Sequence, residues 1–240
     1  MKRVTLLQSN YLPWRGYFDF MAKSDEFIVY DSCQYTVNDW RNRNQIKMAD
    51  GVRWITVPVI TKGRFGQRIT EAEVVDHKWV KTHLGTLTTA VSKAPFGRQV
   101  LDLLGDCYAR CTGTRFLHEV NVDFLRAVHA YLGFGCRLTD DSEYGVDELD
   151  GLSPSAKVAE LVRRAGGSRY LTGPRGLDYL EAADFAQRDI AIDVLDYSTL
   201  APYAQLYGDF VDHLSVVDLL ANVGDRSAKH FTSTIREVSG

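Results

Sequence analysis

The chain has 240 residues, of which 45% are hydrophobic and 25% charged, and its formal net charge at pH 7 is −3. This is ordinary globular composition, and the charge balance argues against a surface built for DNA or an anionic membrane. No apolar run reaches the roughly 18 residues of a membrane span, and the N-terminus lacks the layout of a signal peptide. We therefore expect a cytoplasmic protein that does not insert into a membrane.

The first 75 residues predict strands with one helix between them. In order, we expect a strand at 4–7, a helix at 17–23, a strand at 26–30, hairpin strands at 45–48 and 52–57, and a strand at 68–75. Asp50 and Gly51 support the hairpin, because Asp-Gly is a strong two-residue turn signal.

The middle of the chain is helical, and strands alternate with helices after it. Apolar residues recur at spacings of three and four within 78–132. We then expect a strand at 136–138, a helix at 154–165, a strand at 169–171, a helix at 177–187, a strand at 190–194 and a helix at 215–221. This alternation predicts an α/β fold with a mainly parallel, Rossmann-like sheet flanked by helices. We expect a single domain over 1–228 and a tail over 229–240 whose last ten residues are disordered.

The loop after the first strand is the most informative stretch of the sequence. It places amide and aromatic side chains where an ordinary turn needs small polar residues. In open α/β sheets, ligands bind outside the carboxyl ends of the strands. We therefore predict that this loop binds substrate through Gln8, Asn10, Tyr11, Trp14 and Tyr17.

A second polar and aromatic loop follows the second strand. Asp31 closes that strand and is a candidate catalytic base, although a turn cap is the simpler interpretation. Arg41 and Arg43 are candidates to bind phosphate or carboxylate in bidentate fashion, and we favour Arg43 because amides flank it. The remaining substrate-binding candidates in this loop are Gln34, Tyr35, Trp40, Asn42 and Asn44.

Further candidates are scattered along the chain. His83 is a candidate base, and Lys157 lies one turn into a helix, where it favours anions. Gly173 belongs to a loop whose backbone is able to approach a ligand closely. The other candidates, which have structural networking as an equal alternative, are Gln205, Asp218 and Asn222.

Several chemistry-bearing residues form no recognisable site. His118, His129 and His213 belong to no constellation, and the turn of Asp140, Asp141 and Glu143 is interpreted as solvated. The cysteines, Cys33, Cys107, Cys111 and Cys136, are interpreted as reduced thiols, and only for Cys33 does a reactive role stay open. The sequence indicates no metal site and names no cofactor.

The two N-terminal loops resemble a known family. The pattern Gln8-x-Asn10-Tyr11-Leu-Pro-Trp14-x-Gly-Tyr17, followed by Asp31 with Gln34 and Tyr35 and then by 40–44, is similar to the WbqC-like protein family. Later matches are 56–58, 170–173, Tyr203 with Gln205, and 215–224. Ser9 departs from the proline expected there. The opening also resembles the nucleotidylyltransferase superfamily, but Trp14 and Tyr17 stand where that superfamily has histidines.

The resemblance implies a tailoring enzyme from a polysaccharide or natural-product gene cluster. Our first hypothesis is a transferase that joins an acyl or aminoacyl group to an amine. Asp31 or His83 would be the base, and Arg43 or Lys157 would bind the donor's phosphate. The alternatives are a nucleotidyltransferase or nucleotide-dependent ligase, and a non-catalytic module that binds a carrier-linked or sugar-linked intermediate. The expected partner is a small-molecule or sugar-linked substrate with an activated acyl or aminoacyl donor; the sequence leaves the oligomeric state open.

Overall fold

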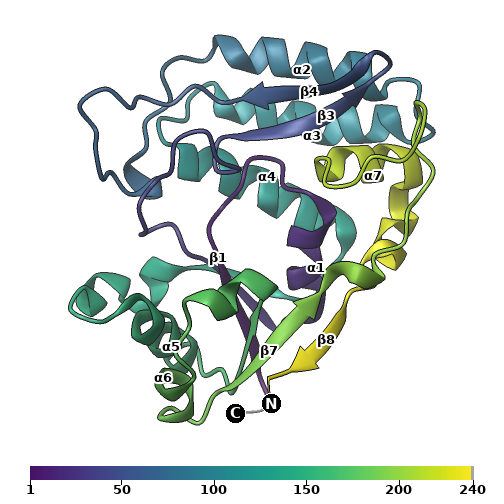
Figure 1. The fold of residues 1–240 in the computed structure, drawn as a ribbon. Helices are drawn as coiled ribbons and strands as arrows, with labels where there is room; N and C mark the ends of the chain where they lie inside the picture. Colours follow the sequence, from purple (N-terminus) through teal and green to yellow (C-terminus); the bar gives the residue numbers. More distant parts are fainter. Residues whose placement is uncertain (239–240) are drawn as a thin grey trace.

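A six-stranded sheet in the order β5-β2-β1-β6-β7-β8 organises the computed structural model, which describes residues 1–238 (Figure 1). Its strands are β1 (Arg3–Leu7), β2 (Glu26–Val29), β5 (Arg137–Asp140), β6 (Arg169–Thr172), β7 (Ala191–Asp196) and β8 (Thr234–Glu237). Neighbouring strands are parallel except β7 and β8. The predicted α/β fold with a mainly parallel sheet is confirmed, whereas the nucleotidylyltransferase-like opening stays a prediction.

Helices cover both faces of the sheet, because successive side chains of a strand point to opposite faces. Val4 and Leu6 of β1 belong to the core cluster that includes α5 (Pro154–Arg164) and α6 (Ala182–Ala186). The larger cluster, on the opposite face, includes side chains of α1 (Arg15–Lys23), α2 (Lys78–Val91), α3 (Gly97–Cys111), α4 (Leu117–Leu132) and α7 (Val216–Val223). None of the helices formed by residues 1–238 is long and apolar enough to cross a membrane.

The predicted hairpin is present as a separate two-stranded sheet. Strands β3 (Arg43–Met48) and β4 (Gly51–Thr56) are antiparallel, and Gly51 has a φ of 129° that few other residues adopt. The hairpin packs against α2 and α7 (Figure 1). Asn44 on β3 thereby comes close to the loop that follows β1, and this contact shapes the site described below.

Three predicted elements are wrong. The expected strand at 68–75 is replaced by a 3-10 turn, Ile69–Glu71, with isolated β-bridges at Arg68, Glu73 and Val74. The turn forms because the Glu71 carboxylate accepts a 2.9 Å hydrogen bond from the Arg68 backbone N–H. The expected helix at 177–187 is split into a 3-10 segment, Pro174–Asp178, and the short α6. Between them, Ser155 Oγ accepts a 2.8 Å hydrogen bond from the Glu181 backbone and fixes an extended residue.

The third error concerns the expected disordered tail. Residues Thr234–Glu237 form β8, which pairs with β7 in the register Leu195 to Ile235. Arg169 also forms an ion pair with Glu237. The sequence of this segment is mostly polar and therefore did not predict a strand. Backbone pairing with β7 and the ion pair with Arg169 stabilise β8 instead. Residues 239–240 of the predicted tail lie outside the described residues.

Candidate functional site

A cavity of about 720 Å³ opens at the carboxyl ends of β1 and β6. The strand order reverses at this point: the chain continues from β1 to β2 and β5 on one side, whereas β6 and β7 lie on the other side of β1. Such a switch point is the usual ligand crevice of an open α/β sheet. The loop after β1 contributes Gln8 and Asn10, and the loop after β6 contributes Gly173 and Arg175.

A second cavity of about 400 Å³ adjoins the first. It adds Pro13, Asn44 and His213 to the lining. The two cavities share five lining residues, namely Asn10, Trp14, Trp40, Arg175 and Tyr197. They are therefore two lobes of one site, and we call them the larger lobe and the smaller lobe.

Eight aromatic residues line the larger lobe: Trp14, Tyr17, Phe20, Tyr30, Trp40, Tyr170, Tyr179 and Tyr197. The Trp14 ring is central, with its centroid 5.2 Å from that of Tyr197 and 4.5 Å from that of His213, on which it stacks. A Cβ atom at Gly16 would lie 2.2 Å from the Trp14 ring. Glycine at position 16 is thus required for the tryptophan to fold back over the start of α1.

The loop between β1 and α1 is held in a strained conformation. Leu12 has a φ of 44°, in the left-handed region that non-glycine residues rarely adopt. The Asn44 side-chain amide donates hydrogen bonds to the carbonyl oxygens of Tyr11 at 3.2 Å and Leu12 at 2.8 Å. Backbone strain of this kind occurs at ligand sites, where the surrounding structure over-determines it.

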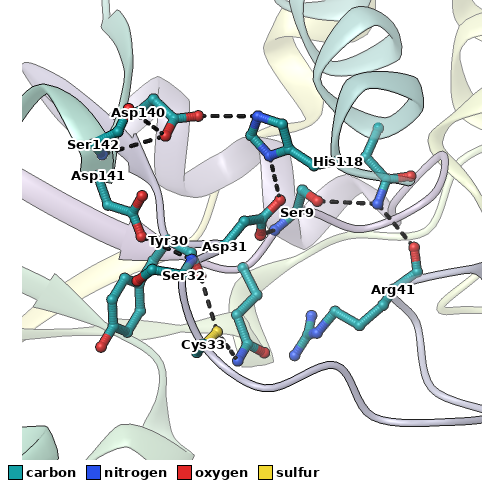
Figure 2. Close-up of polar contacts among 12 residues, drawn as sticks. Ser9, Tyr30, Asp31, Ser32, Cys33, Arg41, His118, Asp140, Asp141 and Ser142 are labelled. Atoms are coloured by element: carbon teal, nitrogen blue, oxygen red, sulfur yellow. Dashed lines mark hydrogen bonds and ion pairs between the residues drawn. The ribbon is translucent and has the colours of Figure 1, made fainter. Parts of the chain in front are cut away.

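A buried ion-pair network supports the same loop (Figure 2). His118 Nδ1 on α4 lies 2.8 Å from Asp31 Oδ2, and His118 Nε2 lies 3.2 Å from Asp140 Oδ2. The other Asp31 oxygen accepts a 2.7 Å hydrogen bond from the Ser9 backbone. Burial disfavours the imidazolium, but the hydrogen bonds and charges of the two aspartates outweigh it and raise the pKa of His118 to about 10.

Asn121, also on α4, completes the clamp on the loops. Its amide donates to Ser9 Oγ at 3.0 Å and to the Arg41 carbonyl at 2.8 Å. Asp141 Oδ2 accepts a 3.0 Å hydrogen bond from the Ser32 backbone, and burial raises the pKa of Asp141 to about 6. Helix α4 therefore fixes the loops after β1 and β2, and through Asp140 it also holds the end of β5.

The lining is rich in hydrogen-bond donors. Arg41 lines the larger lobe and donates to the Asn10 side-chain oxygen, while Arg175 lines both lobes. Within the part of the chain that the structure describes, the residues that line the two lobes include no aspartate, glutamate or lysine. The lining thus carries the positive charge of Arg41 and Arg175 against an aromatic wall, and the Asp39 carboxylate, 3.9 Å from Arg41, lies outside the lining.

Seven of the predicted substrate-binding residues line this site: Gln8, Asn10, Trp14, Tyr17, Trp40, Asn44 and Gly173. Their roles in binding remain predictions. The loops after β1, β2 and β6 meet at one edge of the sheet, as expected from parallel strands.

The predicted catalytic residues lie elsewhere. Asp31 is completely buried in the network with His118 and is not part of the lining. His83 is also buried, its Nδ1 lies 2.9 Å from Tyr11 Oη, and burial lowers its pKa to about 4. Arg43 lies with its guanidinium 4.4 Å from the Trp54 ring centroid on the hairpin. These three side chains contact structural partners, and none of them lines the two lobes.

The remaining predicted side chains also have local partners. Tyr11 and Tyr35 are buried, Asn42 donates to the Val57 carbonyl, and Lys157 forms a 2.8 Å ion pair with Asp150. Gln34 is exposed, and its backbone forms an isolated antiparallel β-bridge with Arg68.

Gln205, Asp218 and Asn222 belong to one network away from the lining. Lys47 Nζ donates to Gln205 Oε1 at 2.7 Å, and Tyr203 donates to Asp218 Oδ2 at 2.8 Å. The Asn222 amide donates to the Asp218 carbonyl at 2.8 Å. This network secures the loop that ends at His213, and a role of the three residues in binding stays a prediction.

Sequence reasoning missed three residues of the site and its support, His118, Arg175 and His213, and it ranked Arg41, which lines the larger lobe, below Arg43. The acidic turn is not simply solvated, because Asp141 is buried and Asp140 contacts His118. For Arg175, the signal was its position directly after a strand and Gly-Pro. His213 carried no signal. Burial raises the pKa of Cys33 to about 11, which favours the thiol over the thiolate.

The chain belongs to the WbqC-like protein family, whose model matches residues 8–230. It is 41% identical over 224 residues to "Uncharacterized protein Rv1507c" of Mycobacterium tuberculosis, with 93% of this chain and 95% of that protein covered. No solved structure matches the chain. The family match includes both N-terminal loops that carried the resemblance.

Proposed function

We propose that the protein is a transferase that joins an acyl or aminoacyl group to an amine. One observation carries this proposal: the two lobes share five lining residues, so two reactants held in them would meet at a common wall. Alignment of two reactants accounts for up to about 7–11 kcal/mol of a barrier. A site of this shape therefore supplies catalysis largely by positioning.

The larger lobe suits the donor. Its volume of about 720 Å³ is that of a pocket for a sizeable small molecule, and its aromatic walls accommodate a planar ring. The smaller lobe, of about 400 Å³, suits a compact amine. Asn10 and Arg175 line both lobes and therefore lie where the groups would react.

His213 takes the role of proton acceptor in this proposal. Among the described residues that line the two lobes it is the sole histidine, and its backbone φ of 60° is strained. Its Nδ1 lies 3.7 Å from Asp212 Oδ2, and Arg15 lies 3.5 Å from Asp212. Histidine is the side chain that exchanges protons most readily near neutral pH.

The amine nitrogen attacks the carbonyl carbon of the activated donor and forms the new C–N bond. His213 accepts the proton that the nitrogen loses. The bond between the carbonyl carbon and the leaving group breaks, and its electron pair departs with the leaving group.

A non-catalytic binding module is the second candidate. The described residues that line the larger lobe include no histidine and no carboxylate, which suits a ligand that is held without reacting there. Nucleotidyl transfer has weaker support, because Trp14 and Tyr17 stand in place of its phosphate-stabilising histidines.

The test is product formation followed by mass spectrometry. Acetyl-coenzyme A, acetyl phosphate and aminoacyl-tRNA serve as donors, and glucosamine 6-phosphate and a nucleotide-linked amino sugar serve as acceptors. The proposal expects an N-acylated product, formed about 100-fold more slowly by His213→Gln with unchanged donor affinity. His77→Gln, an exposed histidine outside the lining, is the control. Donor binding without any product would favour the binding module.

A further inference from the structure

We propose that Arg41 and Arg175 bind the phosphate of a nucleotide-like group on the donor, with its planar ring against the aromatic wall of the larger lobe. The inference rests on the proposed function, because it names the class of donor. Arg41 and Arg175 thereby take the role that the sequence had suggested for Arg43 and Lys157, because Arg43 and Lys157 both have partners outside the lining.

The larger lobe has a positively charged lining, which favours an anionic ligand. Arg41 and Arg175 both line it, and no aspartate, glutamate or lysine is found among its described lining residues. The carboxylate nearest to Arg41 is Asp39, with 3.9 Å between Arg41 Nη2 and Asp39 Oδ2. Beyond its hydrogen bond to Asn10 and its 3.9 Å contact with Asp39, the Arg41 guanidinium keeps further N–H donors, and its planar fork fits the oxygens of a phosphate.

Arg175 is free for a ligand. Its side chain is exposed, and within residues 1–238 it has no hydrogen bond and no ion pair. Its loop is nevertheless fixed: a Cβ atom at Gly176 would lie 2.0 Å from Thr172 Oγ1, so the chain turns closely against the end of β6. The loop presents Arg175 to both lobes without using it in the fold.

The amide groups of the lining also favour an acceptor-rich ligand. The Asn10 side-chain oxygen already accepts a hydrogen bond from Arg41, and the Asn44 side-chain oxygen accepts one from the Gln45 backbone at 2.7 Å. Within residues 1–238 the Asn10 amide nitrogen has no hydrogen-bond acceptor, and Asn10 lines both lobes. Donors without matching acceptors suit phosphate oxygens better than an ammonium group.

The aromatic wall argues for a ring attached to the phosphate. Tyr30, Tyr170 and Tyr179 line the larger lobe together with Val158 of α5, so this part of the site is apolar. Planar rings pack on such surfaces by stacked or edge-to-face contacts. Phosphate at the arginines and a base on the tyrosines together describe a nucleotide.

Isothermal titration calorimetry tests this with three probes: ADP, adenosine and inorganic pyrophosphate. We expect ADP to bind the wild-type protein at least tenfold more tightly than either part alone. In Arg175→Ala, ADP should lose at least tenfold in affinity, about 1.4 kcal/mol. Adenosine binding should not change. The matched control is Arg98→Ala on α3, whose side chain is 95% exposed and outside the lining.

Three results would overturn the inference: wild-type protein that does not bind ADP, adenosine that binds as tightly as ADP, or ADP affinity that is equal in Arg175→Ala. The melting temperature of Arg175→Ala checks that the variant is folded, and Arg175→Lys keeps the charge without the fork. Protein that binds ADP as described but forms no product would contradict the transferase alone. Protein that forms product but binds ADP independently of Arg175 would contradict only this phosphate site.

Discussion

His118 on α4 and Asp31 at the end of β2 form an ion pair of 2.8 Å between residues 87 positions apart in the sequence. Asp31 is completely buried and also accepts a hydrogen bond from Ser9 in the first site loop. One side chain of the helical segment therefore fixes the loop that lines the cavity. The pair belongs to the support of the site rather than to its lining.

We predict that His118→Ala destabilises the protein strongly. Removal of the imidazolium leaves the buried Asp31 carboxylate without its cation, and such a loss costs about 3–5 kcal/mol. Urea unfolding followed by circular dichroism measures the change in free energy of unfolding. Lys81→Ala, at an exposed position of α2 whose side chain has no hydrogen bond or ion pair within residues 1–238, should change it by less than about 0.5 kcal/mol. A loss below about 1 kcal/mol in His118→Ala would contradict the role of the pair.

The same pair predicts a dependence of stability on pH. The pKa of His118 is raised from 6.5 to about 10, so between these values the folded protein binds more protons than the unfolded chain. The stabilisation is complete below pH 6.5 and is lost as the pH rises toward 10. We expect the difference in unfolding free energy between wild type and His118→Ala to shrink over this range. Parallel curves from pH 7 to pH 10 would be inconsistent with the raised pKa.

Tyr11→Phe should also be destabilising, although it removes one oxygen atom. Tyr11 Oη lies 2.9 Å from His83 Nδ1 and 2.5 Å from Tyr108 Oη, and all three side chains are buried. Loss of a partner for buried polar groups costs about 1–3 kcal/mol. Thermal unfolding measures it, with Tyr207→Phe as control, since within residues 1–238 the Tyr207 hydroxyl has no hydrogen bond. Equal melting temperatures of the two variants would refute the prediction.

Two glycines of α3 should respond in opposite ways to alanine. A Cβ atom at Gly97 would lie 1.8 Å from the Val91 carbonyl oxygen, so Gly97→Ala forces the backbone apart. Gly105 has no atom within 4 Å of such a Cβ, so Gly105→Ala should stabilise the helix by about 0.5–1 kcal/mol. Chemical denaturation of both variants tests this. Similar effects of the two changes would show that the tight contact at Gly97 is absent.

Local patterns predicted most of the fold. The apolar runs of β1 and β2, the Asp50-Gly51 turn and the periodicity of α2 and α4 each act over a few residues, and the structure contains all of them. The segment 68–75 failed because one Glu71 hydrogen bond closes a turn that its β-like composition hides. The site loops were recognisable because Trp14 and Gly16 stand together where a plain turn would not need them.

The assignment of roles within the site depends on long-range contacts, which a single sequence does not show. Arg41 and Arg43 are two positions apart on the chain, yet one lines the larger lobe and the other packs on Trp54. His118 meets two aspartates only because the first turn of α4 lies beside the ends of β2 and β5. Residue type and spacing in the sequence predict neither the different positions of the two arginines nor the contacts of His118.

The central claim is that the two-lobed cavity between β1 and β6 binds ligand, and a thermal-shift screen tests it most directly. Wild type, Arg175→Ala and Trp14→Ala are compared with nucleotides, acyl-coenzyme A thioesters, aminoacyl-tRNA and amino sugars. A ligand that binds only the native state stabilises it by about 2.7 kcal/mol when its concentration is 100 times its Kd, and the melting temperature rises as a result. We predict a shift with an adenine-containing donor that is lost in both variants. No shift with any compound, or shifts that persist unchanged in both variants, would contradict the claim.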